Sequence, residues 1–381
     1  MLPSAKAHLG EMDYFRAFGL TSIVIIHSMA FFFSLPDANI VSHAFQGLTV
    51  NLFRYGRFVF MFITGLVFFY SYQDRKLDPQ RFYRRRLKNL IIPYAVWTAV
   101  YLALDYWSGT IQWSDPVSFV AVWAQSLVNG NAFYHLYYII VTIQFYLFLP
   151  LLLVIFKPRR PRLWAGLLMA SGFLICMVYF YGLEAQSTRI VSLVAGTPWA
   201  GVTAWLLMYK DHLLFSYLPF YLLGGLAGIY LEECHRWLAD HIGWIEMGLL
   251  LSAALVIGQY FYCYRYLGQS WDLTVSVFKP SFYLYSLFAI AILFRLSLVM
   301  MSSGSLQTLI KMLSSKSLGI YLMHPAVLFF LHNYFYLWSQ ALPSYILVII
   351  DPFIALTISY LITRFLSGNN YTRFVVGEAG K

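Results

Sequence analysis

Ten stretches of mostly apolar residues run through the chain, each close to the roughly 20 residues that an α-helix needs to span a bilayer. They lie at residues 14–35, 53–72, 90–107, 134–156, 163–183, 213–231, 244–263, 278–299, 317–338 and 344–366. Only 11 % of the 381 residues are charged, whereas about a quarter of a soluble domain is charged. The sequence therefore predicts an integral membrane protein and argues against a soluble one.

The basic residues predict the orientation of these helices. With the N-terminus inside, 20 of the 26 Lys and Arg residues fall on the cytoplasmic side, as the positive-inside rule requires. The six that this topology places outside are Arg54, Arg57, Arg189, Lys210, Arg265 and Lys279. We therefore predict an all-α bundle of about ten transmembrane helices with both termini cytoplasmic. The net charge of +10 then reflects membrane orientation, and nucleic acid is not an expected partner.

The distribution of apolar residues predicts one transmembrane domain over 1–366 and a short cytoplasmic tail over 367–381. Three cysteines, Cys176, Cys234 and Cys263, are widely separated, so neither a disulfide framework nor a thiolate metal site is expected. We expect no metal ion in the protein.

The first apolar stretch carries two ionisable residues on one helix face. Arg16 and His27 are eleven residues apart, which is about three helical turns and roughly 16 Å along the axis. Asp13 can pair with Arg16 at i,i+3 spacing. Ionisable side chains inside a membrane span are costly and so mark candidate functional sites. The alternative is a structural pair: a snorkelling arginine and a hydrogen-bonded core histidine.

A basic segment follows the second stretch, and we predict it as a cytoplasmic connection over residues 74–94. It contains Arg85, Arg86 and Lys88 among seven basic and two acidic residues. A topology signal explains this charge, and so does binding of anionic lipid or of a phosphorylated cytosolic ligand. Arginine suits phosphate because its guanidinium donates two parallel hydrogen bonds.

The fourth and ninth stretches also carry polar residues. Ser317, Tyr321 and His324 follow i, i+4, i+7 and share a helix face, and Pro325 frees a carbonyl in the preceding turn. His135 opens the fourth stretch. A kinked packing helix and an interfacial histidine are the alternatives to a functional role.

Several of these segments together resemble the acyltransferase-3 family of bacterial membrane proteins. The first helix has the family's spacing of a basic residue, ten residues and a histidine, in Arg16 and His27. The Phe-rich segment that ends in Ser-Gly appears as FVFMFITG, with Thr64 in place of Ser and Val59 where Pro is common.

The rest of the resemblance follows in the same order along the chain. The family pattern FYxxRLxRLxxPY appears as FYRRRLKNLIIPY at 82–94, where Arg86 matches the first arginine and Asn89 replaces the second basic residue. The patterns HLYY at 135–138 and SLGIYLMHP at 317–325 complete it.

The resemblance implies an O-acyltransferase that moves an acetyl or other short acyl group from cytosolic acyl-CoA, most simply acetyl-CoA, to a hydroxyl of an envelope or exported polysaccharide. It implies His27 as the general base together with Arg16, and Arg16, Arg85, Arg86 and Lys88 as donor ligands. Supporting residues are expected to be Asp13, His135, Tyr321 and His324.

The expected setting is the bacterial cytoplasmic membrane, as in exopolysaccharide and biofilm systems. Expected partners are the lipid bilayer, acyl-CoA, a carbohydrate acceptor, and polysaccharide synthesis or export proteins or a separate extracytoplasmic transferase. Because only 15 residues follow position 366, we expect direct modification of the acceptor or transfer to another protein. A glycan or lipid-linked sugar transporter and a structural synthase subunit are the competing hypotheses.

Overall fold

The computed structural model describes residues 8–32, 40–72, 77–112, 115–155, 162–334 and 344–378. Most of these residues are helical, and no strand occurs among them. The helices that correspond to the ten predicted stretches are α1 (Glu11–Phe32), α3 (Gly56–Tyr72), α4 (Pro79–Trp107), α6 (Tyr137–Ile155), α7 (Arg162–Ala185), α10 (Leu218–Ile229), α12 (Ile242–Phe261), α14 (Pro280–Ser303), α16 (Ser317–Tyr334) and α18 (Ser344–Gly368).

Shorter helices connect them. They are α2 (Ile40–Phe53), α5 (Pro116–Asn129), α8 (Ser187–Val194), α9 (Ala200–Met208), η1 (Lys210–His212), η2 (Leu214–Ser216), α11 (Leu231–Asp240), η3 (Tyr262–Tyr266), α13 (Trp271–Thr274), α15 (Gln307–Ser315) and η4 (Arg373–Val376).

Five helices in the described residues are long and apolar enough to cross a membrane. They are Ala44–Tyr72, Pro79–Trp107, Ile242–Tyr266, Pro280–Ser303 and Ile349–Gly368. Three shorter apolar helices accompany them, at Tyr137–Leu153, Ala170–Tyr179 and Leu218–Ile229. The all-helical membrane fold is thus confirmed in its class.

The segment predicted as a cytoplasmic connection over 74–94 is helical from residue 79 onward, because α4 begins there. Asp78 caps this helix by accepting a hydrogen bond from the backbone N–H of Arg81 at 3.1 Å, and Pro79 occupies the first turn. The basic residues therefore lie along a helix. Between the third and fourth apolar stretches lies α5, which Asp115 caps.

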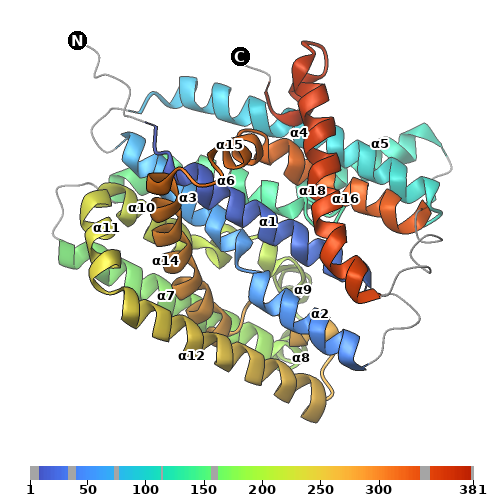
Figure 1. The fold of residues 1–381 in the computed structure, drawn as a ribbon. Coiled ribbons are helices and arrows are strands. Elements are labelled where there is room, and N and C mark those ends of the chain that lie inside the picture. The colour runs from blue at the N-terminus through green and yellow to red at the C-terminus, as the bar shows by residue number, and fades with distance from the viewer. Residues whose placement is uncertain are drawn as a thin grey trace.

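Helix α1 occupies the middle of the bundle. It contacts α3 and α14 on one side and α16 and α18 on the other (Figure 1). A residue on α1 can therefore meet side chains from helices that are far apart in sequence.

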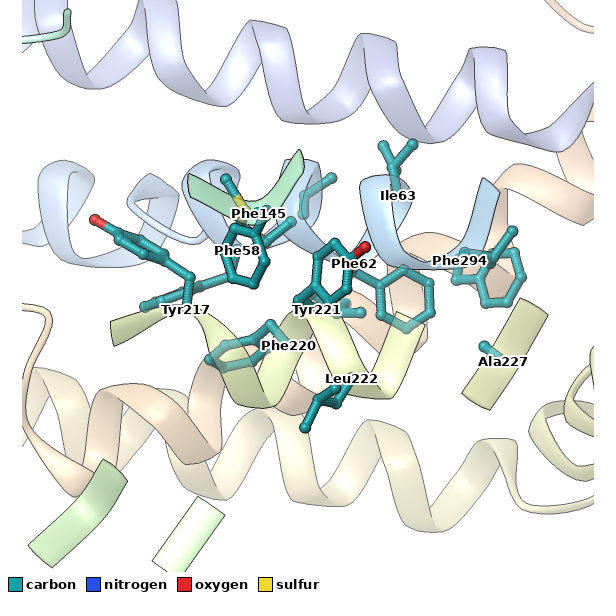
Figure 2. Close-up of a cluster of buried hydrophobic side chains, with 14 of the residues drawn as sticks. Phe58, Phe62, Ile63, Phe145, Tyr217, Phe220, Tyr221, Leu222, Ala227 and Phe294 are labelled. Atoms are coloured by element: carbon teal, nitrogen blue, oxygen red, sulfur yellow. The ribbon is translucent and has the colours of Figure 1, made fainter. Parts of the chain in front are cut away.

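Helices α3 and α10 pack closely because glycines face carbonyl groups across their interface. A Cβ at Gly224 would lie 2.0 Å from the Phe62 carbonyl oxygen, and one at Gly65 would lie 2.0 Å from that of Tyr221. Figure 2 shows aromatic side chains such as Phe58 and Phe220 filling the space beside this contact. Small residues that let helix backbones approach are a usual device for packing within membranes.

Candidate active site

A cavity of about 310 Å³ lies among α1, α3, α4, α6 and α16, and we call it the arginine cavity. Arg16 and Arg86 line it, together with Thr64 and Ser317. Two residues that the sequence analysis proposed for the donor therefore face one cavity, although 70 positions separate them in the chain.

Arg16 is held in place by neighbours on two helices. Its Nη1 lies 3.3 Å from Asp13 Oδ1, which is the predicted i,i+3 pair, and 3.1 Å from Ser314 Oγ. Ser314, at the end of α15, donates to the same Asp13 oxygen at 2.7 Å. The spacing of residues in the sequence does not predict that Ser314 contacts Asp13 and Arg16, because the tertiary fold brings α15 against α1.

The other proposed donor residues lie elsewhere. Lys88 is exposed and does not line the arginine cavity. The Arg85 side chain lies outside the described part of the structure.

A second cavity, of about 620 Å³, contains His27 and His135, and we call it the histidine cavity. Its size falls within the range of about 300–1,000 Å³ that is usual for small-molecule sites. Arg16 and His27 thus line different cavities from the same helix α1.

Three histidines that are remote in sequence meet beside this cavity. The ring centroids of His27 and His324 are 5.3 Å apart, and those of His135 and His324 are 5.7 Å apart. His324 is fully buried, and its Nδ1 lies 3.2 Å from the Ile320 carbonyl oxygen. Its Nε2 is buried and has no hydrogen-bond partner among the described residues. A hydrogen bond at one ring nitrogen decides which nitrogen carries the proton, so Nδ1 is the donor of His324.

A tyrosine hydroxyl bonds to the backbone of α16 on both sides of Pro325. Helix α16 contains Pro325 in its interior. The Tyr101 hydroxyl donates to the Leu322 carbonyl at 2.6 Å and accepts from the Ala326 N–H at 3.2 Å. A bond of this kind satisfies polar backbone within an apolar environment.

Tyr138 and Tyr321 line both cavities. Their ring centroids are 6.1 Å apart. The Tyr138 hydroxyl donates to the Arg57 carbonyl at 3.0 Å, and the Tyr321 hydroxyl donates to the His135 carbonyl. These two side chains therefore form the partition between the arginine cavity and the histidine cavity.

The histidine cavity also contains charged residues that the sequence analysis assigned only to membrane topology. Arg54, Arg57 and Lys210 line it, with Asp211 as an acidic neighbour. Their position on the predicted outer side departs from the positive-inside rule, and this departure is the one feature of the sequence that could have indicated a functional role. Sequence alone does not show that a turn between α2 and α3 meets η1.

A glutamine inside α6 anchors the segment that carries Lys210 and Asp211. Gln144 donates from Nε2 to the His212 carbonyl at 2.7 Å and accepts from the Leu214 N–H at 2.9 Å. Asp211 lies 2.9 Å from the Nδ1 of His212. Burial acts to raise the pKa of the Asp211 carboxyl, but the His212 hydrogen bond and the charges of His212 and Arg57 hold the pKa below its ordinary value.

No group of His, Cys, Asp and Glu across the described ranges is arranged to hold a metal ion. The polar groups that face the two cavities are instead imidazoles, guanidiniums and hydroxyls. This set can bind anionic groups and transfer protons.

A family model described as an acyltransferase domain matches residues 9–364. The match includes the helices that line both cavities. Neither the curated proteins nor the solved structures yielded a match. The extent of the family match shows that the chain belongs to the acyltransferase-3 family and is a membrane enzyme that transfers acyl groups other than aminoacyl groups.

Proposed function

We propose that the protein transfers an acetyl or other short acyl group from cytosolic acyl-CoA to a hydroxyl of an envelope or exported polysaccharide, or of its lipid-linked precursor. The observation that carries this proposal is the pair of cavities that share Tyr138 and Tyr321. One cavity offers two guanidiniums for a phosphorylated donor. The other offers a histidine for a hydroxyl acceptor.

Arg16 and Arg86 are the donor ligands in this proposal. Coenzyme A carries several phosphates, and guanidinium groups bind phosphate through paired hydrogen bonds. Asp13 and Ser314 keep the Arg16 guanidinium directed at the cavity. The pantetheine arm, about 15–20 Å when extended by chain-length reasoning, then carries the thioester past the tyrosine partition toward His27.

His27 is the general base. A neutral imidazole accepts the proton of the acceptor hydroxyl while that oxygen attacks the thioester carbonyl. The carbon–sulfur bond breaks, and the CoA thiolate leaves and takes up the proton. Ser28, the hydroxyl residue next to His27, is fully buried and does not line either cavity. This arrangement favours direct transfer over an acyl-serine intermediate.

His135, Tyr321 and His324 support His27 in this scheme. The His27 ring packs against Tyr134, at a centroid distance of 4.6 Å, and against His324, at 5.3 Å. Contact with two rings limits rotation of the imidazole, which keeps a general base aligned with its substrate.

The proposed setting is the bacterial cytoplasmic membrane, with ten spans and both termini cytoplasmic. The ten helices that correspond to the apolar stretches and the excess of basic residues on the predicted inner side support this topology. It would place the arginine cavity toward the cytosol and the histidine cavity toward the acceptor. Exopolysaccharide assembly systems are the proposed context, and acetyl-CoA is the proposed donor.

The decisive experiment uses the full chain in proteoliposomes with labelled acetyl-CoA and envelope polysaccharide from cells that lack the protein. Loss of a general base lowers the rate by about 10²–10⁴-fold, so we expect this loss in His27→Gln. Binding of acetyl-CoA should stay within about twofold of wild type, since His27 does not line the arginine cavity.

His241→Gln is the matched control, because His241 is exposed and lines neither cavity. Full transfer by His27→Gln would overturn the proposal. Movement of glycan across the membrane without acetyl-CoA would instead favour a transporter. Mass and NMR analysis of the glycan from cells with and without the protein would identify the ester and its position.

A further inference from the structure

The histidine cavity holds three cationic side chains against one carboxylate. Arg54, Arg57 and Lys210 line it together with Asp211. A neutral hydroxyl acceptor does not require this charge. Charged groups within a membrane protein are costly, so an excess of cationic residues around a cavity indicates a functional role.

Arg57 shows the imbalance most directly. Its guanidinium lies over the Tyr137 ring, 5.8 Å from the centroid, and interacts with the Tyr217 hydroxyl. Among the described residues, no carboxylate oxygen lies within 4.0 Å of this guanidinium, although the charge of Asp211 acts on it. The Asp211 carboxylate is hydrogen-bonded to His212 at 2.9 Å. A partly buried guanidinium whose acidic neighbour is hydrogen-bonded elsewhere can bind an anionic ligand group.

The charged residues belong to the same cavity as the reacting residues. His27, Tyr134 and His135 line it as well. His135 is 1 % exposed, and neither of its ring nitrogens has a hydrogen-bond partner among the described residues. One ligand can therefore contact the cationic residues and the histidines at once. Aromatic rings such as Trp271 and Phe278 line the cavity between these polar groups and offer apolar faces to a sugar ring.

We propose that the histidine cavity selects an acceptor glycan that carries an anionic group, a carboxylate or a phosphate, which Arg57 and Lys210 bind while its hydroxyl faces His27. This inference rests on the proposed function, since it concerns the acceptor of that reaction. The anionic group has two possible sources: an acidic sugar in the polysaccharide, or the phosphate of a lipid-linked precursor. Both would use the same guanidinium and ammonium groups.

The test measures equilibrium binding to the full chain in nanodiscs by titration calorimetry, with two matched pairs of probes. The first pair is a glucuronic-acid-containing disaccharide and its carboxyl-reduced counterpart. The second is a hexyl-phosphate-linked disaccharide and the corresponding hexyl glycoside. We expect the anionic member of one pair to bind about tenfold tighter, which corresponds to about 1.4 kcal/mol. Preference in the first pair identifies an acidic sugar, and preference in the second identifies a lipid-linked phosphate.

Variants locate the preference in this cavity. Arg57→Gln and Lys210→Gln should each bring the affinity for the anionic probe close to that of the neutral one. Asp211→Asn should strengthen binding of the anionic probe and leave the neutral one unchanged, because it removes the opposing charge. Arg265→Gln makes the same charge change at an exposed residue that does not line the cavity. This variant should prefer the anionic probe over the neutral one as strongly as wild type does.

The binding measurement separates this inference from the proposed reaction. In a His27→Gln background the anionic preference should persist, since the base is not needed for binding. Equal affinity for both members of both pairs would overturn the inference even if acyl transfer is observed. A preference that survives Lys210→Gln and Arg57→Gln would overturn it as well. Absence of acyl transfer by the wild-type protein, with the preference intact, would instead count against the catalytic proposal alone.

Discussion

The arginine cavity is lined by α1, α3, α4, α6 and α16, whereas the histidine cavity also draws on a turn between α2 and α3, on η1 and on α13. The first is built almost entirely from faces of long helices. The second depends on short segments that tertiary contacts hold in place, such as the one anchored by Gln144. Our proposal places donor and acceptor chemistry in these two differently built regions, whose linings share Tyr138 and Tyr321. The difference suggests how each region can be disturbed separately.

The largest expected effect comes from a change that moves α3 away from α10, because this change disturbs both cavities at once. Helix α3 contributes Thr64 to one cavity and Arg57 to the other. In Gly224→Ala the new Cβ would lie 2.0 Å from the Phe62 carbonyl oxygen, so the helices must move apart. We expect a loss of about 2–3 kcal/mol in unfolding free energy, measured by thermal unfolding in detergent, and reduced affinity for donor and acceptor together.

Gly258→Ala is the matched control, because a Cβ at this position in α12 meets nothing within 4 Å. Replacing a helical glycine by alanine in open space should stabilise the protein by about 0.5–1 kcal/mol. Equal unfolding temperatures for the two variants would contradict the close packing of α3 and α10.

Donor binding should depend on the arginine cavity and not on the basic segment as a whole. A hydrogen bond to a charged group contributes about 1.5–3 kcal/mol, so Arg16→Gln and Arg86→Gln should each raise KM for acetyl-CoA about 10- to 100-fold. KM for the acceptor should not change. Initial rates at varied concentrations of each substrate measure both constants.

Arg81→Gln tests the alternative of a general charge effect. Arg81 is on the same helix as Arg86 but is exposed and does not line the cavity. If its replacement raises KM for acetyl-CoA as much as Arg86→Gln does, surface charge and not the cavity binds the donor. Lys88→Gln makes the same comparison for the residue that family resemblance proposed and that lies outside the cavity lining.

The contrast between the cavities also explains what the sequence could predict. Helical periodicity and apolar length predicted the ten helices, the Asp13–Arg16 pair and the shared face of Arg16 and His27, because these are local properties of single helices. Family motifs brought His135 and His324 into the candidate site, and the structure brings both rings near His27.

Arg57 and Lys210 show the limit of that reasoning. Their charge was interpreted as an exception in membrane topology, because neither the first turn of α3 nor a short helix such as η1 indicates by its spacing which residues of other segments lie beside it. Ser314 was missed for the same reason. Which helices are adjacent is decided by packing across the whole bundle, and a single sequence does not encode that adjacency in its spacing.

The tyrosine partition allows a smaller and more specific test. Tyr321→Phe keeps the ring between the cavities but removes the hydroxyl that donates to the His135 carbonyl. A hydrogen bond of this kind contributes about 1 kcal/mol net, so we expect about a fivefold loss in kcat with KM for acetyl-CoA unchanged. Tyr285→Phe is the matched control, since the Tyr285 hydroxyl donates to the Leu52 carbonyl at 2.7 Å and lines neither cavity. Similar rate losses in both variants would mean that general destabilisation, and not the partition, lowers the rate.

The smallest expected effect concerns Asp211, whose charge opposes the cations of the histidine cavity. Its pKa is held below the ordinary value of about 3.9, so the charged form contributes stability at neutral pH, and that contribution is lost only as pH falls through the lowered pKa. The side chain is 33 % exposed, and solvent screening limits the contribution to about 0.5 kcal/mol. The unfolding temperatures of wild type and Asp211→Asn should therefore differ by a constant amount from pH 7 to about pH 5 and converge below about pH 4. In a His212→Gln background the difference should be smaller throughout, because the partner that lowers the pKa is gone. A wild type that unfolds at a lower temperature than Asp211→Asn at pH 7, with a gap that closes as the pH falls, would show that the carboxylate destabilises the fold, and that its role beside Arg57 is to tune the charge of the cavity.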